Sequence, residues 1–252
     1  MDLLSGFWQV MIRPEHQERT AVITSRGLYE FVVMAFGLCN APATFQRLMD
    51  TVIEPRYRRF IETYIDDVIV YSETEKDHLD HLDTLFAQLE KHKLVFKLTK
   101  CHFFQRNVKF LGHILSAGEV RPNPKTVQAI QKWQRPTQGK NRLKALRAFL
   151  GTVGWYRKFI ANFAEKAAPL NALLRKDAPW MWTRECERAF VTLRDALVTA
   201  PDLRLADPNK DYVMRTDASD QRVGVVLQHA DDDNKLHPVA YASRALTAAE
   251  RK

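Results

Sequence analysis

The chain has 252 residues, of which 46% are hydrophobic, and its formal net charge is +8. This size and composition exclude general disorder, and since no run of about 18 apolar residues occurs, a membrane span and membrane partners are not expected. Three widely spaced cysteines and the lack of a signal-peptide pattern indicate reduced thiols and an intracellular location, with cytoplasm and nucleus both left open.

The first part of the chain alternates apolar and polar residues in the manner of a sheet. Strands are predicted over residues 7–12, 20–24 and 29–33, with a turn at Arg26-Gly27 between the last two. Pro42 suits the first turn of a helix over residues 43–52. Residues 63–71 form two short β-branched runs around Asp66-Asp67, which predicts a tight hairpin that carries two acids.

A second group of elements follows the hairpin. Residues 76–91 have the period of an amphipathic helix, with Thr74 and Asp77 at the positions of a capping box. The expected apolar stripe of this helix consists of Leu79, Leu82, Phe86 and Leu89. Short strands are predicted over residues 108–111 and 113–115.

From Pro122 onward the pattern is that of helices separated by prolines. One helix is expected from Asn123-Pro124 to near Pro136, and one or two more over residues 142–163. Thr183 is expected to cap a further helix. The apolar face of that helix consists of Cys186, Ala189, Phe190, Leu193 and Leu197. Strands over residues 212–216, 223–228 and 239–242 complete the prediction.

The positive charge is concentrated between Arg121 and Lys176. This segment has thirteen Lys or Arg residues and one acid, Glu165, so it carries +12 and the remaining residues sum to −4. Aromatic residues lie between the cations, which favours a nucleic-acid-binding lobe. The alternative is a solvated basic surface that contributes only to solubility.

Two adjacent aspartates in the sequence Tyr64-Ile65-Asp66-Asp67 are the strongest chemical signal. A hairpin tip with two like charges is costly unless a cation is bound, and carboxylate oxygens suit Mg²⁺. Taken alone, an ordinary surface turn is the simpler interpretation. Asp2 precedes another predicted strand, however, and three carboxylates from neighbouring strands can hold two metal ions for in-line phosphoryl transfer.

Six motifs occur in order along nearly the whole chain. They are DLLSGF at 2–7, MAFGLCNAPATFQ at 34–46, YIDD at 64–67, FLGH at 110–113, FLGTVGWYRKFI at 149–160, and TDAS at 216–219 followed by Gly224 and YASR at 241–244. Together they resemble the reverse transcriptase and ribonuclease H segment of gypsy-class (Ty3-like) LTR retrotransposons. The resemblance implies an α+β fold, with a partial palm at residues 1–117, a basic helical thumb at 118–178, and a linker helix with a truncated ribonuclease H-like domain at 179–252.

The resemblance also implies a role for individual residues. Asp2, Asp66 and Asp67 would be the catalytic and metal-binding acids, with Mg²⁺ or Mn²⁺ as cofactor. The nucleotide-binding set would be Phe7 as a sugar gate, Phe36, Gly37, Gln46 on the template-primer side, and Lys97 near the triphosphate. The primer grip would consist of Phe110, Leu111, Gly112 and His113. The nucleic-acid-binding cations would be Arg142, Lys144, Arg147, Arg157 and Lys158. Asp217 would be the remnant of the ribonuclease H site. Ala35 departs from the proline usual in the family, which would leave the nucleotide loop less rigid.

RNA-directed DNA polymerisation by two-metal nucleotidyl transfer is therefore the expected function. Template with primer, as RNA or DNA, and deoxynucleoside triphosphates are the expected partners, and self-association is left open. The chain is expected to begin at the first catalytic aspartate and to end short of the second ribonuclease H acid, so polymerisation by the isolated chain would be weak or absent and RNA cleavage is not expected. The alternative is a noncatalytic nucleic-acid-binding relic.

A structural zinc site is not expected, because no Cys-x-x-Cys pair accompanies the histidines.

Overall fold

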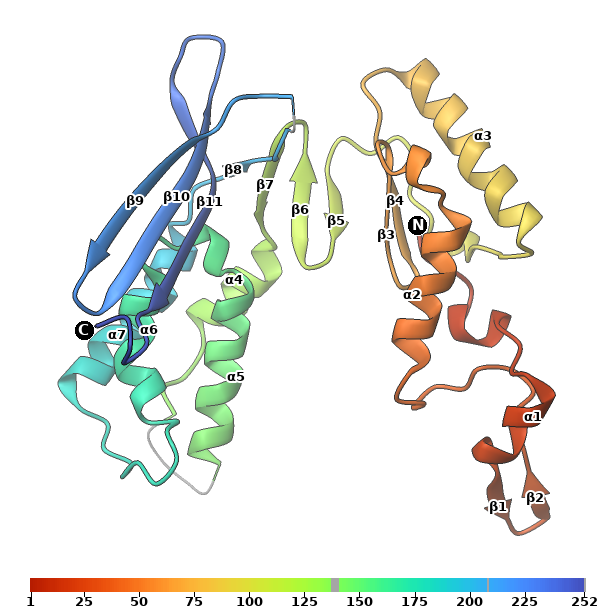
Figure 1. Cartoon of the computed structure of the whole chain (residues 1–252), viewed down its shortest axis with the longest axis horizontal. Helices are drawn as coiled ribbons and strands as arrows, with labels where there is room; N and C mark the ends of the chain where they lie inside the picture. Colours follow the sequence, from red (N-terminus) through yellow and green to blue (C-terminus); the bar gives the residue numbers. More distant parts are fainter. Residues whose placement is uncertain (137–140, 208, 252) are drawn as a thin grey trace. The chain divides into compact units, whose positions relative to one another are not determined.

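The computed structural model describes residues 1–136, 141–207 and 209–251. These residues form two compact units, Met1–Gln105 and Arg106–Lys252, and each unit combines helices with antiparallel strands (Figure 1). The predicted α+β class is confirmed. In the described part of the chain, no helix is long and apolar enough to cross a membrane.

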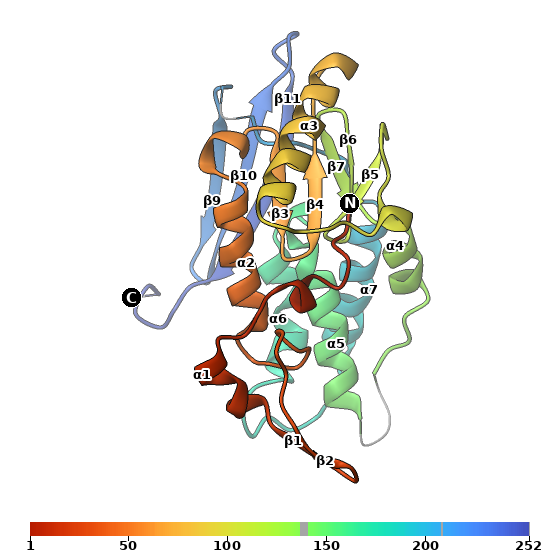
Figure 2. The same ribbon diagram turned by 90° about the vertical axis from the view of Figure 1, so that its right-hand side faces the viewer.

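Unit 1 is built around the antiparallel β3–β4 hairpin and two helices. Its elements are η1 (Gly6–Gln9), α1 (Pro14–Gln17), η2 (Glu18–Thr20), β1 (Val22–Thr24), β2 (Gly27–Tyr29), α2 (Ala41–Val52), η3 (Pro55–Tyr57), β3 (Ile61–Tyr64), β4 (Asp67–Val70), α3 (Glu75–Lys91) and η4 (Leu98–Lys100). Helices α2 and α3 lie against the hairpin (Figure 2). Their buried residues Phe45, Met49 and Leu85 form one core with Ile61 and Val68 of the hairpin.

Close packing beneath the first motif explains one of its glycines. A Cβ atom added to Gly6 would lie 2.8 Å from Cζ of Phe45, which is fully buried. Any larger residue would push the 3-10 helix η1 away from α2. Gly6 is therefore required by packing between the N-terminal segment and this helix.

Three predictions for unit 1 are wrong in detail. The strand expected over residues 29–33 is displaced, because Gly27 to Tyr29 form β2 and pair with β1, while Val33 makes only an isolated bridge with Met11. Residues 7–12 do not form a strand, because Ser5 has a left-handed conformation with φ 50° and starts the 3-10 helix η1. The stripe predicted on α3 is also shifted, since Leu79 and Phe86 are 54% and 41% exposed whereas Leu85 is buried. The Thr74 cap is confirmed, because its side chain accepts a hydrogen bond from the backbone N–H of Asp77.

Unit 2 contains two sheets and four α-helices among its described residues. Its elements are β5 (Val108–Phe110), β6 (His113–Ser116), β7 (Glu119–Pro122), α4 (Pro124–Gln131), α5 (Arg142–Trp155), η5 (Arg157–Phe159), α6 (Phe163–Ala172), α7 (Arg184–Val198), β8 (Leu203–Arg204), β9 (Val213–Ser219), β10 (Arg222–Ala230) and β11 (Leu236–Ala245). One sheet has the order β5-β6-β7-β8 and the other β11-β10-β9. The short strand β8 returns after α7 to pair with β7, a pairing that the sequence did not predict.

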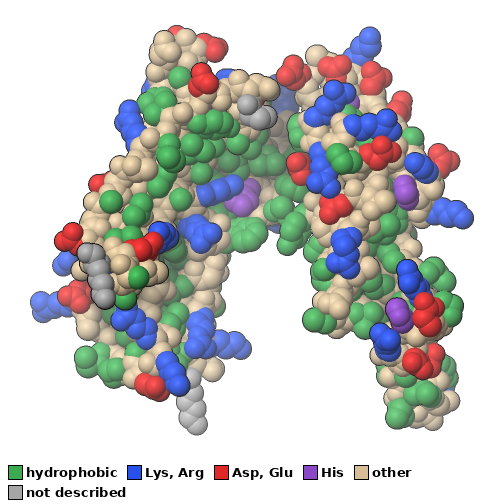
Figure 3. Space-filling view, viewed as in Figure 1, with side chains coloured by type: hydrophobic (Ala, Val, Ile, Leu, Met, Phe, Trp, Pro, Cys, Tyr) green, Lys and Arg blue, Asp and Glu red, His purple; other side chains and the backbone are tan. Residues whose placement is uncertain are grey.

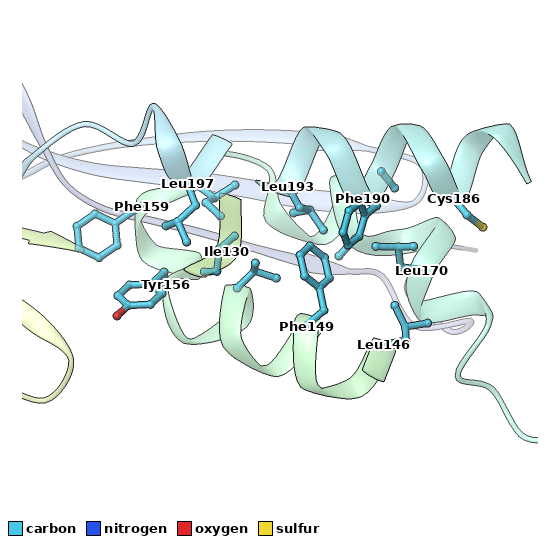
Figure 4. Packing of buried hydrophobic residues seen from close by; sticks show 14 of the residues in the cluster. Ile130, Leu146, Phe149, Tyr156, Phe159, Leu170, Cys186, Phe190, Leu193 and Leu197 are labelled. Atoms are coloured by element: carbon cyan, nitrogen blue, oxygen red, sulfur yellow. The ribbon is translucent and has the colours of Figure 1, made fainter. Parts of the chain in front are cut away.

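The core of unit 2 lies between α5, α6 and α7 (Figure 4). Phe149 and Phe190 are both buried, with ring centroids 4.4 Å apart. The predicted apolar face of α7 is confirmed, because all five of its residues are buried. Pro169 lies inside α6, where its ring would normally interrupt a helix. Packing of Ala167 and Leu170 in the core stabilises α6 despite that cost.

Candidate functional site

The turn between β3 and β4 carries the two adjacent aspartates. Tyr64 pairs with Asp67 in the hairpin, which leaves Ile65 and Asp66 at its tip. Ile65 has a left-handed backbone conformation with φ 56°, which is unfavourable for a β-branched residue. The amide oxygen Oε1 of Gln46 accepts a hydrogen bond of 2.7 Å from the backbone N–H of Ile65. Helix α2 thus stabilises this strained turn directly.

Gln46 is itself held in place by a short polar chain. Its Nε2 donates to Asp50, and Asp50 accepts a further hydrogen bond of 3.0 Å from Arg58. The sequence had suggested only a template-facing role for Gln46, which stays a prediction. Its hydrogen bond with Ile65 could not be read from the sequence, because the two residues are 19 positions apart and meet only when α2 packs on the hairpin.

Backbone pairing brings the third aspartate to the same hairpin. Asp2 forms an isolated antiparallel bridge with Asp67. The N–H of Leu3 donates to the carbonyl of Asp66 over 3.1 Å, and Val68 donates to the carbonyl of Met1 over 2.9 Å. The N-terminal segment therefore lies beside β4 through an isolated bridge, and Asp2 and Asp66 both lie close enough to raise the pKa of Asp67 at this edge of the hairpin.

Three negatively charged side chains, those of Asp2, Asp66 and Asp67, lie near one another at this edge of the hairpin. The pKa of Asp67 is raised, first because its carboxylate is partly shielded from water and then because Asp66 and Asp2 lie nearby. Lys100 offsets part of this charge, since its Nζ lies 2.8 Å from Oδ2 of Asp2. That hydrogen bond raises the pKa of Lys100. Sequence reasoning selected Lys97 and missed Lys100; in the structure the backbone N–H of Lys97 donates to the carbonyl of Asp2.

The donor set of this edge fits a divalent cation in chemistry and charge. Three carboxylates supply hard oxygen atoms, and the negative charges of Asp66 and Asp2 contribute to the raised pKa of Asp67 after the partial shielding of its carboxylate from water. Within residues 1–136, 141–207 and 209–251, no group of three His, Cys, Asp or Glu is already arranged to hold a metal ion. Asp2 instead forms the ion pair with Lys100.

Aromatic rings from two of the motifs cluster in unit 1. Phe7 lies 5.4 Å from Phe36 and 5.5 Å from Phe45, measured between ring centroids. Phe36 is 63% exposed, and the next residue, Gly37, has φ +92°, a conformation that favours glycine. Ala35 is buried. This arrangement leaves the exposed Phe36 ring available for an external ligand.

In unit 2, the turn of the β5–β6 hairpin contacts the end of α5. The hydroxyl of Tyr156 donates to the carbonyl of Gly112 over 2.6 Å, and Nε1 of Trp155 donates to the carbonyl of Leu111 over 3.3 Å. His113 is only 9% exposed and lies among the rings of Trp155, Tyr156 and Phe159. Its Nδ1 lies 2.9 Å from the carbonyl of Leu111, which can only accept, so Nδ1 carries the proton.

The predicted nucleic-acid-binding cations lie in two regions of unit 2. Arg142 and Arg147 line a surface hollow of about 320 Å³ together with Arg175 and Lys176. Figure 3 shows Lys and Arg side chains along the part of unit 2 that contains α5. At the other end of α5, Lys158 lies over the Phe159 ring, and burial lowers its pKa.

The remaining predicted site residues are spread over unit 2. Lys144 is exposed on α5 and Arg157 is exposed in η5. Asp217 is exposed on β9, where it pairs with Gly224 of β10. Phe110 ends β5 opposite His113. These positions are compatible with the predicted roles, which stay predictions.

Comparisons with known proteins assign both parts of the chain. Residues 1–115 match the family model described as "Reverse transcriptase (RNA-dependent DNA polymerase)". Residues 182–252 match the model described as "RNase H-like domain found in reverse transcriptase".

The fold also matches a foamy viral protease-reverse transcriptase solved with double-stranded DNA, with a TM-score of 0.84 and 26% identity over all of this chain and 43% of that one. A structure of the foamy viral enzyme with RNA/DNA hybrid gives a TM-score of 0.83, with 26% identity, over 100% of this chain and 33% of that one. These features define a reverse transcriptase domain followed by an RNase H-like domain.

Polyproteins of two transposons are similar to this chain along nearly its whole length. The Transposon Tf2-3 polyprotein of Schizosaccharomyces pombe is 35% identical over 250 residues, which cover 99% of this chain and 18% of the polyprotein. The Retrovirus-related Pol polyprotein from transposon 297 of Drosophila melanogaster is 38% identical over 252 residues, which cover 99% of this chain and 23% of that polyprotein. The chain belongs to the reverse transcriptase family of gypsy-type retrotransposon polyproteins, and it spans about a fifth of the length of these relatives.

The hydrogen bond from Ile65 to Gln46 leads to a first prediction. Replacing Gln46 with Met keeps its approximate length but leaves the N–H of Ile65 without its acceptor. We expect a loss of about 1–3 kcal/mol in the free energy of unfolding of unit 1, measured with denaturant. Arg47→Ala is the matched control, because the exposed Arg47 side chain bonds only to the side chain of Thr44 among the described residues. Equal losses in the two variants would contradict the assigned role.

His113 leads to a pH prediction. Burial lowers the pKa of His113, with the charge of Lys158 as the second cause. The unfolded chain, with a histidine pKa of about 6.5, therefore takes up the proton first. The contribution of neutral His113 to stability is fully present above that pH and is lost as the pH falls toward the folded-state pKa.

Unfolding measured between pH 7.5 and about pH 5 should show this loss in the parent chain. The loss should be smaller in His113→Gln, which keeps an N–H donor but does not titrate. Replacing the exposed His102 with Gln provides the control. An unchanged pH dependence in His113→Gln would show that another group is responsible.

Proposed function

We propose that this chain supplies the catalytic centre of an RNA-directed DNA polymerase, with Asp2, Asp66 and Asp67 as its catalytic acids. The main support is the backbone pairing of Asp2 with Asp67, which gathers the three carboxylates on one edge. Membership of the reverse transcriptase family supports the reaction class. The substrates proposed are deoxynucleoside triphosphates and an RNA or DNA template with its primer.

Asp2, Asp66 and Asp67 would hold Mg²⁺ or Mn²⁺ at this edge. Bound divalent cations would lower the pKa of a primer 3′-hydroxyl and neutralise the leaving pyrophosphate. Lys100 is positioned to exchange partners, because its ion pair with Asp2 is partly exposed. The Gln46 amide would keep the aspartates in register by holding the backbone of Ile65.

Residues around the exposed Phe36 ring would bind the incoming nucleotide. Phe7 packs between Phe36 and Phe45, so its ring is held by neighbours on two sides. A ring fixed in this way is suited to excluding a ribose 2′-hydroxyl by contact. Gly37 would let the backbone approach the nucleotide closely. Lys97 remains the residue proposed to bind the triphosphate.

A second candidate function, nucleic-acid binding without catalysis, is favoured by the hollow in unit 2. Four cations and one acid, Asp177, line it, and the guanidinium of Arg142 lies 5.2 Å from the centroid of the Trp180 ring. An arginine held against an aromatic ring loses less conformational entropy when it binds a phosphate. Two solved foamy viral structures of the same fold contain double-stranded DNA or RNA/DNA hybrid.

Polymerisation by the 252-residue chain alone is proposed to be weak. Without bound metal the candidate acids are not assembled for catalysis, since Asp2 is paired with Lys100 at 2.8 Å. Metal binding and turnover should therefore be measured separately. The third prediction uses thermal melting as a readout that does not require turnover.

Replacing Asp66 with Asn should abolish the rise in melting temperature that Mn²⁺ causes in the parent chain. A ligand that binds only the folded state at a hundredfold excess over its Kd adds about 2.7 kcal/mol of stability. Lys100→Met should enlarge the Mn²⁺ shift, because it frees the Asp2 carboxylate. Primer extension with Mg²⁺ should be near background in the parent chain and undetectable in Asp66→Asn.

The outcomes of this experiment separate the two candidate functions. A metal-dependent shift that survives Asp66→Asn would contradict the assignment of the acids. Robust extension by Asp66→Asn would exclude catalysis at this edge. Binding of template-primer with no metal-dependent shift would favour nucleic-acid binding without catalysis.

The fourth prediction concerns the hollow in unit 2. Arg142→Ala with Arg147→Ala should weaken binding of a B-form duplex and should flatten the slope of log K against log salt by about 0.9 for each phosphate that the variant no longer binds. Arg184→Ala with Arg188→Ala removes the same charge from exposed positions on α7 and serves as the control. Fluorescence anisotropy of a labelled duplex over a range of salt concentrations measures both quantities. An equal change in both double variants would show that only net charge matters.

A further inference from the structure

The β5–β6 turn is a strained element that needs an external support. Leu111 and Gly112 both have left-handed backbone conformations, with φ values of 46° and 77°. Glycine adopts this conformation readily, but leucine does so at a cost. With only three residues in β5 and four in β6, the hairpin offers few ladder hydrogen bonds to maintain the turn. Contacts from outside the hairpin therefore help to offset the cost of the left-handed conformation at Leu111.

Those interactions come from the end of α5. Tyr156 is 2% exposed, and its hydroxyl donates the 2.6 Å hydrogen bond to the carbonyl of Gly112. Its ring packs against His113 and Phe159, with centroids 5.4 Å and 6.2 Å away. Figure 4 shows the hydroxyl directed away from the buried hydrocarbon side chains. A ring fixed on its apolar side presents its one donor to the turn in a single position.

The other carbonyl group of the turn, that of Leu111, also accepts hydrogen bonds. Leu111 accepts hydrogen bonds from Nδ1 of His113 and from Nε1 of Trp155. The fit is close, because a Cβ atom on Gly112 would lie 3.3 Å from Nε1 of Trp155 and 3.5 Å from the Tyr156 hydroxyl. Both carbonyl groups of the strained residues are thus held by side chains that surround the end of α5.

We propose that Tyr156 is a positioning residue that fixes the Leu111–Gly112 turn and thereby the place where this hairpin holds a primer strand. This inference rests on the proposed template-primer binding. Trp155 and His113 restrain the carbonyl of Leu111, but the hydrogen bond of Tyr156 is shorter and half-buried. Loss of the Tyr156 hydroxyl would leave the carbonyl of Gly112 free to rotate and would let the turn adopt other conformations.

Tyr156→Phe tests this role, because it removes the hydroxyl and keeps the ring. Tyr212→Phe is the matched control, since the hydroxyl of Tyr212 donates to a backbone carbonyl of the same unit, that of Asp207, over 3.0 Å. Amide hydrogen exchange at Gly112 and His113 should accelerate about fivefold in Tyr156→Phe, the effect of one typical hydrogen bond. The dissociation rate of a labelled template-primer should rise by a similar factor. Incorporation of 4-aminophenylalanine at position 156 restores a donor and should reverse both changes.

Three outcomes would overturn the proposal. Exchange that accelerates equally throughout unit 2 would show a purely structural role for Tyr156. Faster local exchange without faster dissociation would show that the turn does not hold a primer. Failure of the parent chain to bind template-primer would overturn the proposed binding on which the inference rests. Failure of the proposed catalysis is distinguishable, because it appears in the Asp66→Asn experiment and does not affect exchange at the turn.

Discussion

Backbone pairing between the N-terminal segment and β4 is the constraint on which the candidate catalytic site depends. Carboxylates of like charge do not gather spontaneously. The pKa of Asp67 is raised first by partial shielding of its carboxylate from water and then by the charges of Asp66 and Asp2. The hydrogen bonds made by Leu3 and Val68 fix the backbone that carries these carboxylates. The hydrophobic core behind them supplies the opposing free energy, since Leu3 and Val68 are both 1% exposed. The polar edge is therefore a consequence of an apolar interior.

A hydrogen bond from a side chain to the backbone stabilises one strained turn in each unit. In unit 1 the N–H of Ile65, a residue with φ 56°, is bonded by the Gln46 amide. In unit 2 the carbonyl of Gly112, with φ 77°, is bonded by the Tyr156 hydroxyl. In unit 1 the polar side chain comes from α2, and in unit 2 it comes from the residue that follows α5, where Trp155 and His113 also contact the carbonyl of Leu111. Strain of this type persists only where surrounding structure supports it, which is common at functional sites.

Much of the fold could be predicted from local patterns in the sequence. The hairpin around Asp66 and Asp67, the Thr74 cap and the buried face of α7 each depend on residues close together in the chain. What could not be predicted depends on tertiary interactions. The ion pair of Lys100 with Asp2 joins residues 98 positions apart, and β8 pairs with β7 only because α7 packs back on the core. Leu79 is exposed for the same reason, since an apolar stripe alone does not show which part of it a neighbour will cover.

The two supporting helices also explain why core residues and site residues are neighbours in the motifs. Phe45 is fully buried in unit 1, and the next residue, Gln46, accepts the hydrogen bond from Ile65 in the β3–β4 turn. Val153 is likewise buried in unit 2, and Tyr156 lies three residues further on. Successive residues of an α-helix are rotated by about 100°, so a shift of one position would turn the polar donor or acceptor away from its partner. Packing of the apolar side chain thus sets the register in which the polar one can act, and a substitution in the core can alter a site that it does not touch.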